Sequence, residues 1–225
     1  MRYLEIACFS LEACQIAVEA GAHRIEFCEN YALGGITPKL ADIEHALLLQ
    51  KRPPMHIMIR PRGGDFVYNE EEVLTMINQI EQCNALGADG FVLGCLTKDD
   101  EFNYLACKRL LDAAQNKPCV FHRAFDLVKD AEIALEKLIE LGFSGVLTSG
   151  GLTDAVSGAQ KLKTLQTIAD GRIQIVAGGG VRSKNIKFLQ ETGVNWFHSA
   201  AWNPKSNLPD FSEIVKIREE LMLSI

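Results

Sequence analysis

The chain has 225 residues, of which 48% are hydrophobic and 23% charged, and its formal net charge is −6. This length and composition fit one ordered domain with a sizeable core and exclude a mainly disordered chain. The acidic balance and the lack of a basic stripe argue against nucleic acid as a partner, and the N-terminal apolar segment, interrupted by Glu5, matches neither a signal peptide nor a membrane span. We therefore expect a cytoplasmic protein that does not associate with membranes.

Seven cysteines occur without any C-x-x-C pair, and their odd number favours reduced thiols over a disulfide framework. This agrees with the expected cytoplasmic location.

Eight short apolar or β-branched segments alternate with helical patterns along the chain. We expect strands at 4–8, 24–28, 56–60, 90–94, 119–122, 145–148, 173–177 and 195–198. Apolar residues recur with helical spacing between them, and a last helix is expected at 212–223. Such an alternation predicts parallel strands joined by helices.

The even-numbered strands share a feature that the odd ones lack. Each is entered through a glycine that ends the preceding helix, in the segments GAHRIEF, GADGFVL, GFSGVLT and GVNWFHS, which begin at 21, 87, 142 and 193. This two-unit period favours a closed barrel. We predict one (β/α)8 TIM-barrel domain over residues 1–225, with an open doubly wound sheet as the alternative fold. A homo-oligomer is expected only because barrels commonly associate.

Glutamates interrupt the first two strands at Glu5 and Glu26. In a barrel of this kind the functional surface is built at the C-terminal ends of the strands. A buried glutamate needs a partner, which is an arginine, a histidine, a metal or a ligand. Both residues are candidate catalytic groups, and a structural ion pair with an arginine is the alternative.

Strand three runs into the segment RPRGGDF, which contributes Arg60 and Asp65. A guanidinium group binds carboxylate or phosphate at two points, so Arg60 is a candidate anion-binding residue. The alternatives are that Arg60 pairs with Glu26 and that Asp65 caps a turn.

Histidines follow strands five and eight, at His122 in FHRAFD and at His198 in FHS. Histidine titrates near neutral pH and serves as an acid, a base or a metal ligand. We take both residues, together with Asp126, as candidate catalytic groups.

Glycines follow strands six and seven, in TSGG and in GGG. Backbone amides freed by glycine suit an anion, and barrels often bind phosphate near strands seven and eight. Ser149, Gly150, Gly179 and Gly180 are therefore candidates for an anion or phosphate site, with a ligand-free tight turn as the alternative. No lysine lies in the predicted strands, which argues against a Schiff-base aldolase.

The strand ends resemble the CutC family, whose members are named as copper homeostasis proteins. The segments GAHRIEFCEN with GGITP, IRPRGGDFVYNEEEV, FHRAFD, LGFSGVLTSGG and GRIQIVAGGGVRSKN carry the resemblance. It implies a (β/α)8 barrel, a cytoplasmic location and binding of Cu(I).

In the copper reading, the resemblance implies cysteine ligands on the first two strands, here Cys28 and Cys8. Strand one departs from the pattern, because Ala7 stands at the position of the family's cysteine. Side chains alternate along a strand, so an inward Glu5 predicts an inward Ala7 and an outward Cys8. Cu(I) prefers thiolate and thioether ligands, so Cys28 with Met58 would make a weak site.

Two hypotheses follow for a small-molecule or copper-ion partner. The first, implied by the resemblance, is a Cu(I)-binding homeostasis protein. The second is an enzyme acting on a small anionic or phosphorylated metabolite, with Glu26 and His122 as acid and base and Arg60 holding the anion; a barrel that only binds the metabolite is not distinguished from it. The direction in which Ala7 and Cys8 face decides between copper and the metabolite.

Overall fold

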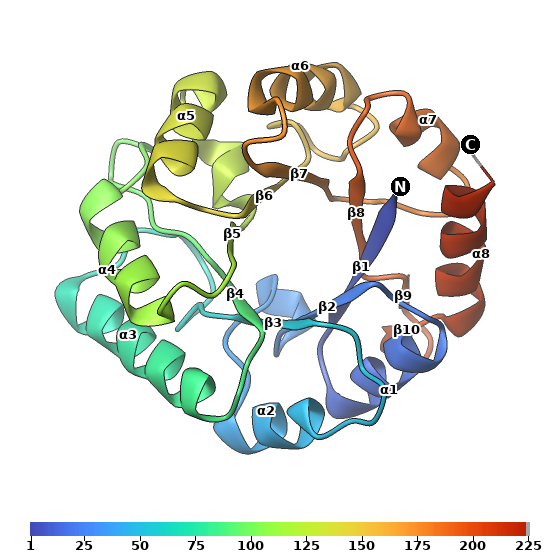
Figure 1. Cartoon of the computed structure of the whole chain (residues 1–225), viewed down its shortest axis with the longest axis horizontal. Coiled ribbons are helices and arrows are strands. Elements are labelled where there is room, and N and C mark those ends of the chain that lie inside the picture. The colour runs from blue at the N-terminus through green and yellow to red at the C-terminus, as the bar shows by residue number, and fades with distance from the viewer. Residues whose placement is uncertain (224–225) are drawn as a thin grey trace.

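Eight parallel strands form a closed barrel in the computed structural model, which describes residues 1–223 (Figure 1). The strands are β1 (Tyr3–Cys8), β2 (Arg24–Phe27), β3 (Met55–Met58), β4 (Gly90–Leu93), β5 (Cys119–Phe121), β6 (Gly145–Thr148), β7 (Gln174–Ala177) and β8 (Trp196–Ser199). They follow each other in chain order around the barrel, and β8 pairs with β1. The prediction of a TIM barrel is confirmed.

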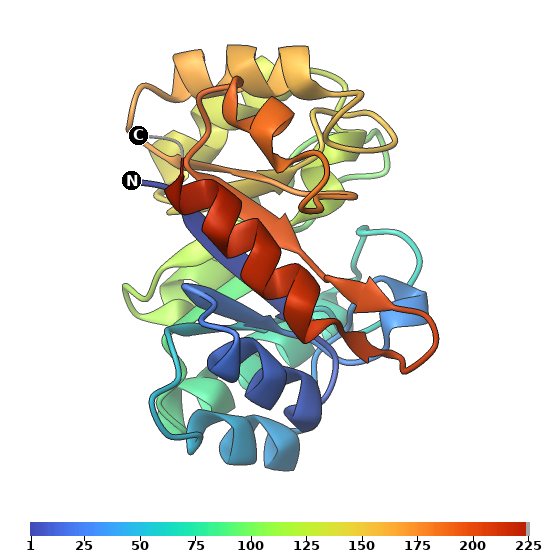
Figure 2. The ribbon, with the colours of Figure 1, turned by 90° about the vertical axis from the view of Figure 1, so that its right-hand side faces the viewer.

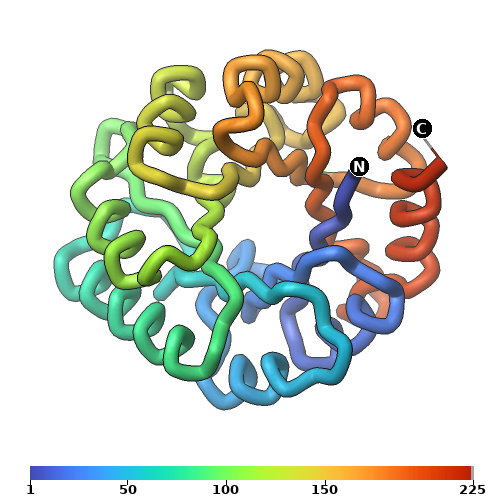
Figure 3. Tube along the Cα trace, in the orientation of Figure 1, coloured from blue at the N-terminus to red at the C-terminus, as the bar shows by residue number. Residues whose placement is uncertain are grey.

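Helices surround the barrel on the outside, as Figure 3 shows along the chain trace. They are α1 (Leu11–Glu19), α2 (Leu40–Leu47), α3 (Glu70–Ala85), α4 (Tyr104–Ala114), α5 (Ala131–Leu141), α6 (Ala159–Ala169), α7 (Ile186–Gln190) and α8 (Phe211–Met222). Local signals set their ends: Asn69 and Glu72 form a capping box at the start of α3, and Gly142, with φ of 95°, ends α5. Among the described residues, no helix is long and apolar enough to cross a membrane.

Two separate apolar clusters follow from the alternation of side chains along the strands. The larger one lies between the barrel and the helices and contains residues such as Ile6, Cys8 and Phe27. The smaller one fills the inside of the barrel and consists of Cys28, Met58, Val92, Val120, Leu147 and Val176. All six of these side chains are buried, so the barrel is packed with side chains at this level.

Short extra elements gather at the C-terminal end of the barrel. The 3-10 helix η1 (Tyr31–Leu33) follows β2, the 3-10 helix η2 (Arg123–Leu127) follows β5, and a hairpin of β9 (Trp202–Asn203) and β10 (Leu208–Pro209) follows β8. Figure 2 shows η1 and the hairpin at the end of the barrel opposite to the N-terminus. η1 and the hairpin are in contact where the ring of Tyr31 stacks on that of Trp202.

Candidate functional site

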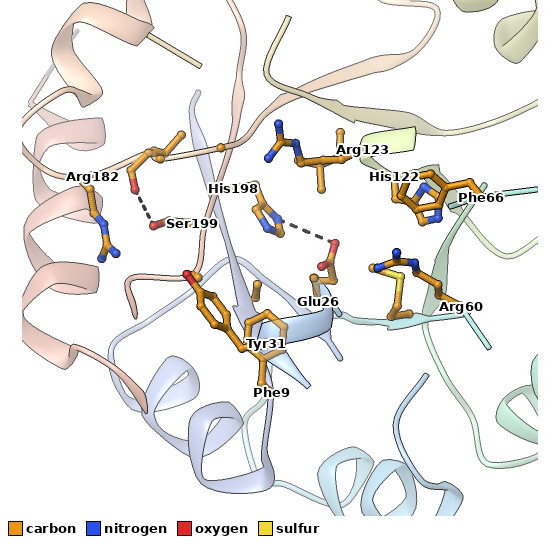
Figure 4. A pocket seen from close by; sticks show the side chains of 18 residues that line it. Phe9, Glu26, Tyr31, Arg60, Phe66, His122, Arg123, Arg182, His198 and Ser199 are labelled. Carbon is orange, nitrogen blue, oxygen red and sulfur yellow. Dashed lines mark hydrogen bonds and ion pairs between the residues drawn. The ribbon is translucent and has the colours of Figure 1, made fainter. Parts of the chain in front are cut away.

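A cavity of about 290 Å³ opens at the C-terminal ends of the strands. Figure 4 shows its labelled side chains converging from β2 and β8 and from the segments that follow the strands. It is lined by Ala7, Phe9, Glu26, Tyr31, Gly34, Met58, Arg60, Phe66, His122, Arg123, Leu147, Gly179, Gly180, Val181, Arg182, His198, Ser199 and Ala200. We call this space the mouth cavity.

Glu5 is fully buried between two partners and does not itself line the mouth cavity. It forms an ion pair with Arg24, and its Oε1 lies 2.7 Å from Nδ1 of His198. Burial alone would raise the pKa of Glu5, but Arg24 and His198 outweigh it and hold that pKa well below its usual range. Glu5 is therefore a carboxylate at neutral pH, and its structural ion pair is with Arg24.

Glu26 is the acidic group that reaches the mouth cavity. Its Oε1 accepts a hydrogen bond from the thiol of Cys28 at 3.2 Å, and its buried Oε2 has no hydrogen-bond partner among the described residues. Oε2 lies 3.9 Å from Nδ1 of His198 (Figure 4). Burial raises the pKa of Glu26, and the nearby His198 offsets only part of that rise. A carboxyl group whose pKa is raised takes up a proton more readily than an ordinary one, which suits it to proton transfer.

His122 faces Glu26 from another wall and is a neutral imidazole. Its Nδ1 accepts from the backbone amide of Ala124 at 3.3 Å, so the ring proton lies on Nε2. This Nε2 is buried and has no partner among the described residues. Burial and the charge of Arg60 lower the pKa of His122 to about 3. His122 therefore offers an uncharged N–H donor to a ligand.

Arg60 is held by backbone carbonyl groups and does not pair with Glu26. Its guanidinium donates to the carbonyl oxygens of Leu33, Gly35 and Gly64 at 2.8 to 3.0 Å and lies over the ring of Phe66. Carbonyl groups leave the positive charge uncompensated, so Arg60 keeps its attraction for an anion.

Asp65 does not reach the mouth cavity. It lies on the exposed loop after β3, where it accepts hydrogen bonds from Arg62 and from the backbone amide of Val67. Its side chain is 67% exposed. The structure therefore places this candidate catalytic residue in the turn-capping position.

Asp126 occupies the glycine loop after β6 (residues 149–158). Its carboxylate accepts from the backbone amides of Ser149 and Gly151, from the hydroxyl of Thr148 and from Arg123. A side chain of the protein thus already fills the place that we expected an anion to take. Of the four candidate residues for that anion, Ser149 and Gly150 belong to this internal network and do not line the mouth cavity.

The loop after β7 (residues 178–185) is open to a ligand. Gly179 and Gly180 line the mouth cavity with φ of 93° and 74°, a conformation that glycine adopts without strain. Among the described residues, the amides of Gly179, Gly180 and Val181 have no hydrogen-bond acceptor. Two guanidinium groups also line the mouth cavity (Figure 4): that of Arg182 and that of Arg123, which is paired with Asp126.

Cys8 and Cys28 lie on opposite sides of the barrel wall. Ala7 lines the mouth cavity, whereas Cys8 belongs to the outer cluster and packs toward Cys14 of α1. Leu4, Ile6 and Cys8 all belong to the outer cluster, whereas Ala7 lines the mouth cavity, so the strand alternates to its last residue and no bend turns Cys8 inward. The structure does not bring together the two thiols that the resemblance implies as copper ligands.

Two residues of the cavity lining and the buried Glu5 together have the composition of a metal site. Ligand atoms of Glu5, Glu26 and His198 lie within 4.8 Å of one another. The ion pair with Arg24 already neutralises Glu5, so a cation would have to compete with a guanidinium.

Three residues at or near the mouth cavity were not expected from the sequence, and of these only Tyr31 lines it. Arg24 precedes Glu26 by two positions and so shares its face of β2, a spacing that could have identified it. Tyr31 of η1 and Trp202 of β9 stack with ring centroids 3.9 Å apart although they are 171 positions apart in the chain, and no sequence pattern indicates this contact.

Comparisons with known proteins agree with this architecture. The model of the CutC family matches residues 2–203. A family protein CutC of Bacteroides thetaiotaomicron is 44% identical over 215 residues, which cover 95% of this chain and 86% of the relative. The copper homeostasis protein cutC homolog of Caenorhabditis elegans is 39% identical over 209 residues, which cover 92% of this chain and 83% of the relative.

A solved structure is similar over most of its length. The crystal structure of a protein named copper homeostasis protein CutC, from Streptococcus agalactiae, is 36% identical in sequence with a TM-score of 0.85. The match covers 89% of this chain and 99% of that chain. Family model, relatives and fold agree, and the chain belongs to the CutC family.

Proposed function

We propose that the protein binds a small phosphorylated or carboxylated metabolite in the mouth cavity and acts on it by acid–base catalysis. The observation that carries this proposal is the charge of the cavity wall. Arg60 and Arg182 line it without a carboxylate partner among the described residues, and each donates instead to backbone carbonyl groups. Guanidinium groups held in this way are suited to a ligand with a negative charge.

The anion is expected at the loop after β7. Gly179, Gly180 and Val181 supply backbone amides without acceptors, and Arg123 and Arg182 lie beside them. Barrel enzymes frequently bind a phosphate group near strands seven and eight. Gly179 and Gly180, which the sequence predicted as part of an anion site, therefore remain candidates for that site.

The chemistry is expected at Glu26 and His122. Glu26 has a raised pKa and a buried oxygen without a partner, which suits a general base. Neutral His122 presents an N–H group, which can stabilise a developing negative charge on a carbonyl or hydroxyl oxygen of the ligand. Two groups with pKa values shifted in opposite directions are typical of an acid–base pair.

Inorganic phosphate is the probe that tests the binding half of the proposal. Isothermal titration at constant ionic strength should give a dissociation constant of about 1 mM or lower. Arg182→Gln should weaken binding about tenfold, since a charge-assisted hydrogen bond contributes about 1.5 kcal/mol or more. Arg172→Gln is the matched control, because Arg172 pairs with Glu136 on the surface, outside the mouth cavity. Equal affinities in all three proteins would contradict the proposal.

Cytoplasmic copper homeostasis through Cu(I) binding is the second candidate function. One observation favours it: the thiol of Cys28 and the thioether of Met58 belong to the same inner cluster, and Met58 lines the mouth cavity. Both are ligand types that Cu(I) prefers. All seven cysteines are free and buried, which suits a reducing compartment.

Anaerobic titration with Cu(I) tests this second function. About one equivalent is expected to bind through soft ligands, and Cys28→Ser should abolish that binding. Cys119→Ser is the control, because Cys119 belongs to the outer cluster. Undiminished binding by the Cys28 variant would rule out the copper site.

A further inference from the structure

The two histidines of the mouth cavity carry their ring protons on opposite nitrogens. Nδ1 of His122 accepts from a backbone amide, so its neutral ring is protonated at Nε2. Nδ1 of His198 lies 2.7 Å from Oε1 of Glu5, and a carboxylate can only accept a hydrogen bond. His198 must therefore be protonated at Nδ1, and in its neutral form Nε2 is free. Among the described residues, this Nε2 has no hydrogen-bond partner.

We propose that Arg24 and Glu5 are positioning residues that keep a proton on Nδ1 of His198, so that its Nε2 exchanges a second proton with a ligand in the mouth cavity. Proton transfer breaks the Nε2–H bond, leaves its electron pair on Nε2 and forms an O–H bond on the ligand. The transfer of a proton from His198 to a ligand rests on the proposed function. The protonation of its Nδ1 does not depend on that function.

Strand register places the three residues side by side. Glu5 of β1 stands opposite Arg24 of β2 on one side and opposite His198 of β8 on the other. Arg24 is itself fixed, because its guanidinium lies 3.9 Å over the ring of Trp196 and donates to Gln174 at 3.2 Å. These contacts hold the imidazole in one orientation, as a carboxylate bonded to the far ring nitrogen does for other functional histidines.

The charges around His198 favour a protonated imidazole over a divalent cation bound between the two carboxylates. Arg24 neutralises Glu5, which leaves Glu26 as the second carboxylate near Nδ1, at 3.9 Å. One negative charge matches one imidazolium, whereas a divalent cation would leave an excess positive charge beside a buried guanidinium.

The charged groups that act on His198 come from two strands. They are Glu5 from β1 and Glu26 and Arg24 from β2. His56 of β3, whose pKa burial lowers to about 4, acts on Glu5. Burial lowers the pKa of His198 as well, but the charges of Glu26 and Glu5 and the hydrogen bond with Glu5 outweigh it, and the net direction is upward.

Long-range ¹H–¹⁵N spectra of the histidine rings test this inference on the whole chain, after treatment with EDTA and without phosphate. At alkaline pH, His198 is expected to show a protonated Nδ1 and an unprotonated Nε2, and His122 the reverse. An Nε2-protonated neutral His198 would overturn the inference. The measurement needs no ligand, so its failure is distinct from a failure of phosphate binding.

A variant then tests the role of Glu5. Glu5→Gln should lower the pKa of His198 by about one pH unit or more, because it removes an adjacent negative charge. Asp65→Asn, on the exposed loop, should leave it unchanged. An unchanged pKa in the Glu5 variant would contradict the role, and if that variant does not fold, the spectra of the unaltered protein still decide. Direct ligation of added Zn²⁺ by Nδ1 of His198 would also overturn it.

Discussion

Cys28 and Glu26 are joined inside the barrel, where the thiol donates to Oε1 of the carboxylate at 3.2 Å. The residue that the copper hypothesis needs is thus in contact with the residue that the enzyme hypothesis needs. The two hypotheses can be separated only by variants that change one of these groups at a time.

Ala7→Cys should create the thiol pair that this chain lacks. Ala7 lines the mouth cavity and Cys28 belongs to the inner cluster, so the new side chain would face the same space as the existing thiol. Two thiolates are expected to raise the affinity for Cu(I) at least about tenfold, measured by competition with a chelator. Cys8→Ser is the control and should leave the affinity unchanged, because Cys8 packs outside the barrel. A loss of affinity in that control would show that Cys8 does reach the metal.

Glu26→Gln should make the thiol of Cys28 more reactive. Burial raises the pKa of Cys28, and the charge of Glu26 and its hydrogen bond raise it further. Removing that charge favours the thiolate, which is the reactive form. Alkylation followed by mass spectrometry at mildly alkaline pH should therefore be severalfold faster, whereas Glu12→Gln on the exposed face of α1 should not change it. Equal rates in the variant and the unaltered protein would mean that burial alone controls this thiol.

His122 should make the protein less stable as the pH falls. Its pKa is about 3 in the folded protein, and the usual value of 6.5 applies to the unfolded chain. Between these values the unfolded state binds one more proton, so the free energy of unfolding decreases by about 1.4 kcal/mol for each unit of falling pH. The His122→Asn variant should lack this contribution. Its free energy of unfolding, measured with urea, should therefore fall less steeply with falling pH.

His45→Asn is the matched control for the pH experiment, because His45 is exposed on α2. It should keep the pH dependence of the unaltered protein. A His122 variant with that same dependence would mean that the ring is protonated in the folded state.

Asp126→Asn should destabilise the loop after β6. The carboxylate accepts from two backbone amides and three side chains, and an amide group would place N–H against some of these donors. A loss of about 2 kcal/mol in the free energy of unfolding is expected, and Asp112→Asn on the surface of α4 should cost far less. Phosphate affinity should be retained, since the expected anion site is the loop after β7. A loss of phosphate binding without a loss of stability would place the anion at β6 instead.

The sequence alone determined the barrel and much of its mouth. Eight apolar segments alternating with helical patterns predicted eight parallel strands, because the period of the side chains reports directly on local structure. The same period predicted that Ala7 faces inward and Cys8 outward, which is what β1 shows. Glu26, Arg60, His122 and His198 were identified because polar side chains at strand ends must meet at one end of the barrel.

Only the tertiary structure decided which partner each polar group takes. Arg60 binds carbonyl oxygens, Glu5 pairs with Arg24, and Asp126 fills the loop after β6. For each of these residues, the sequence was equally compatible with another partner or role. These choices depend on the lateral register of neighbouring strands and on the path of long loops. Neither is encoded in the spacing of residues along a single strand, because hydrogen bonds and ion pairs join side chains that lie far apart in the chain.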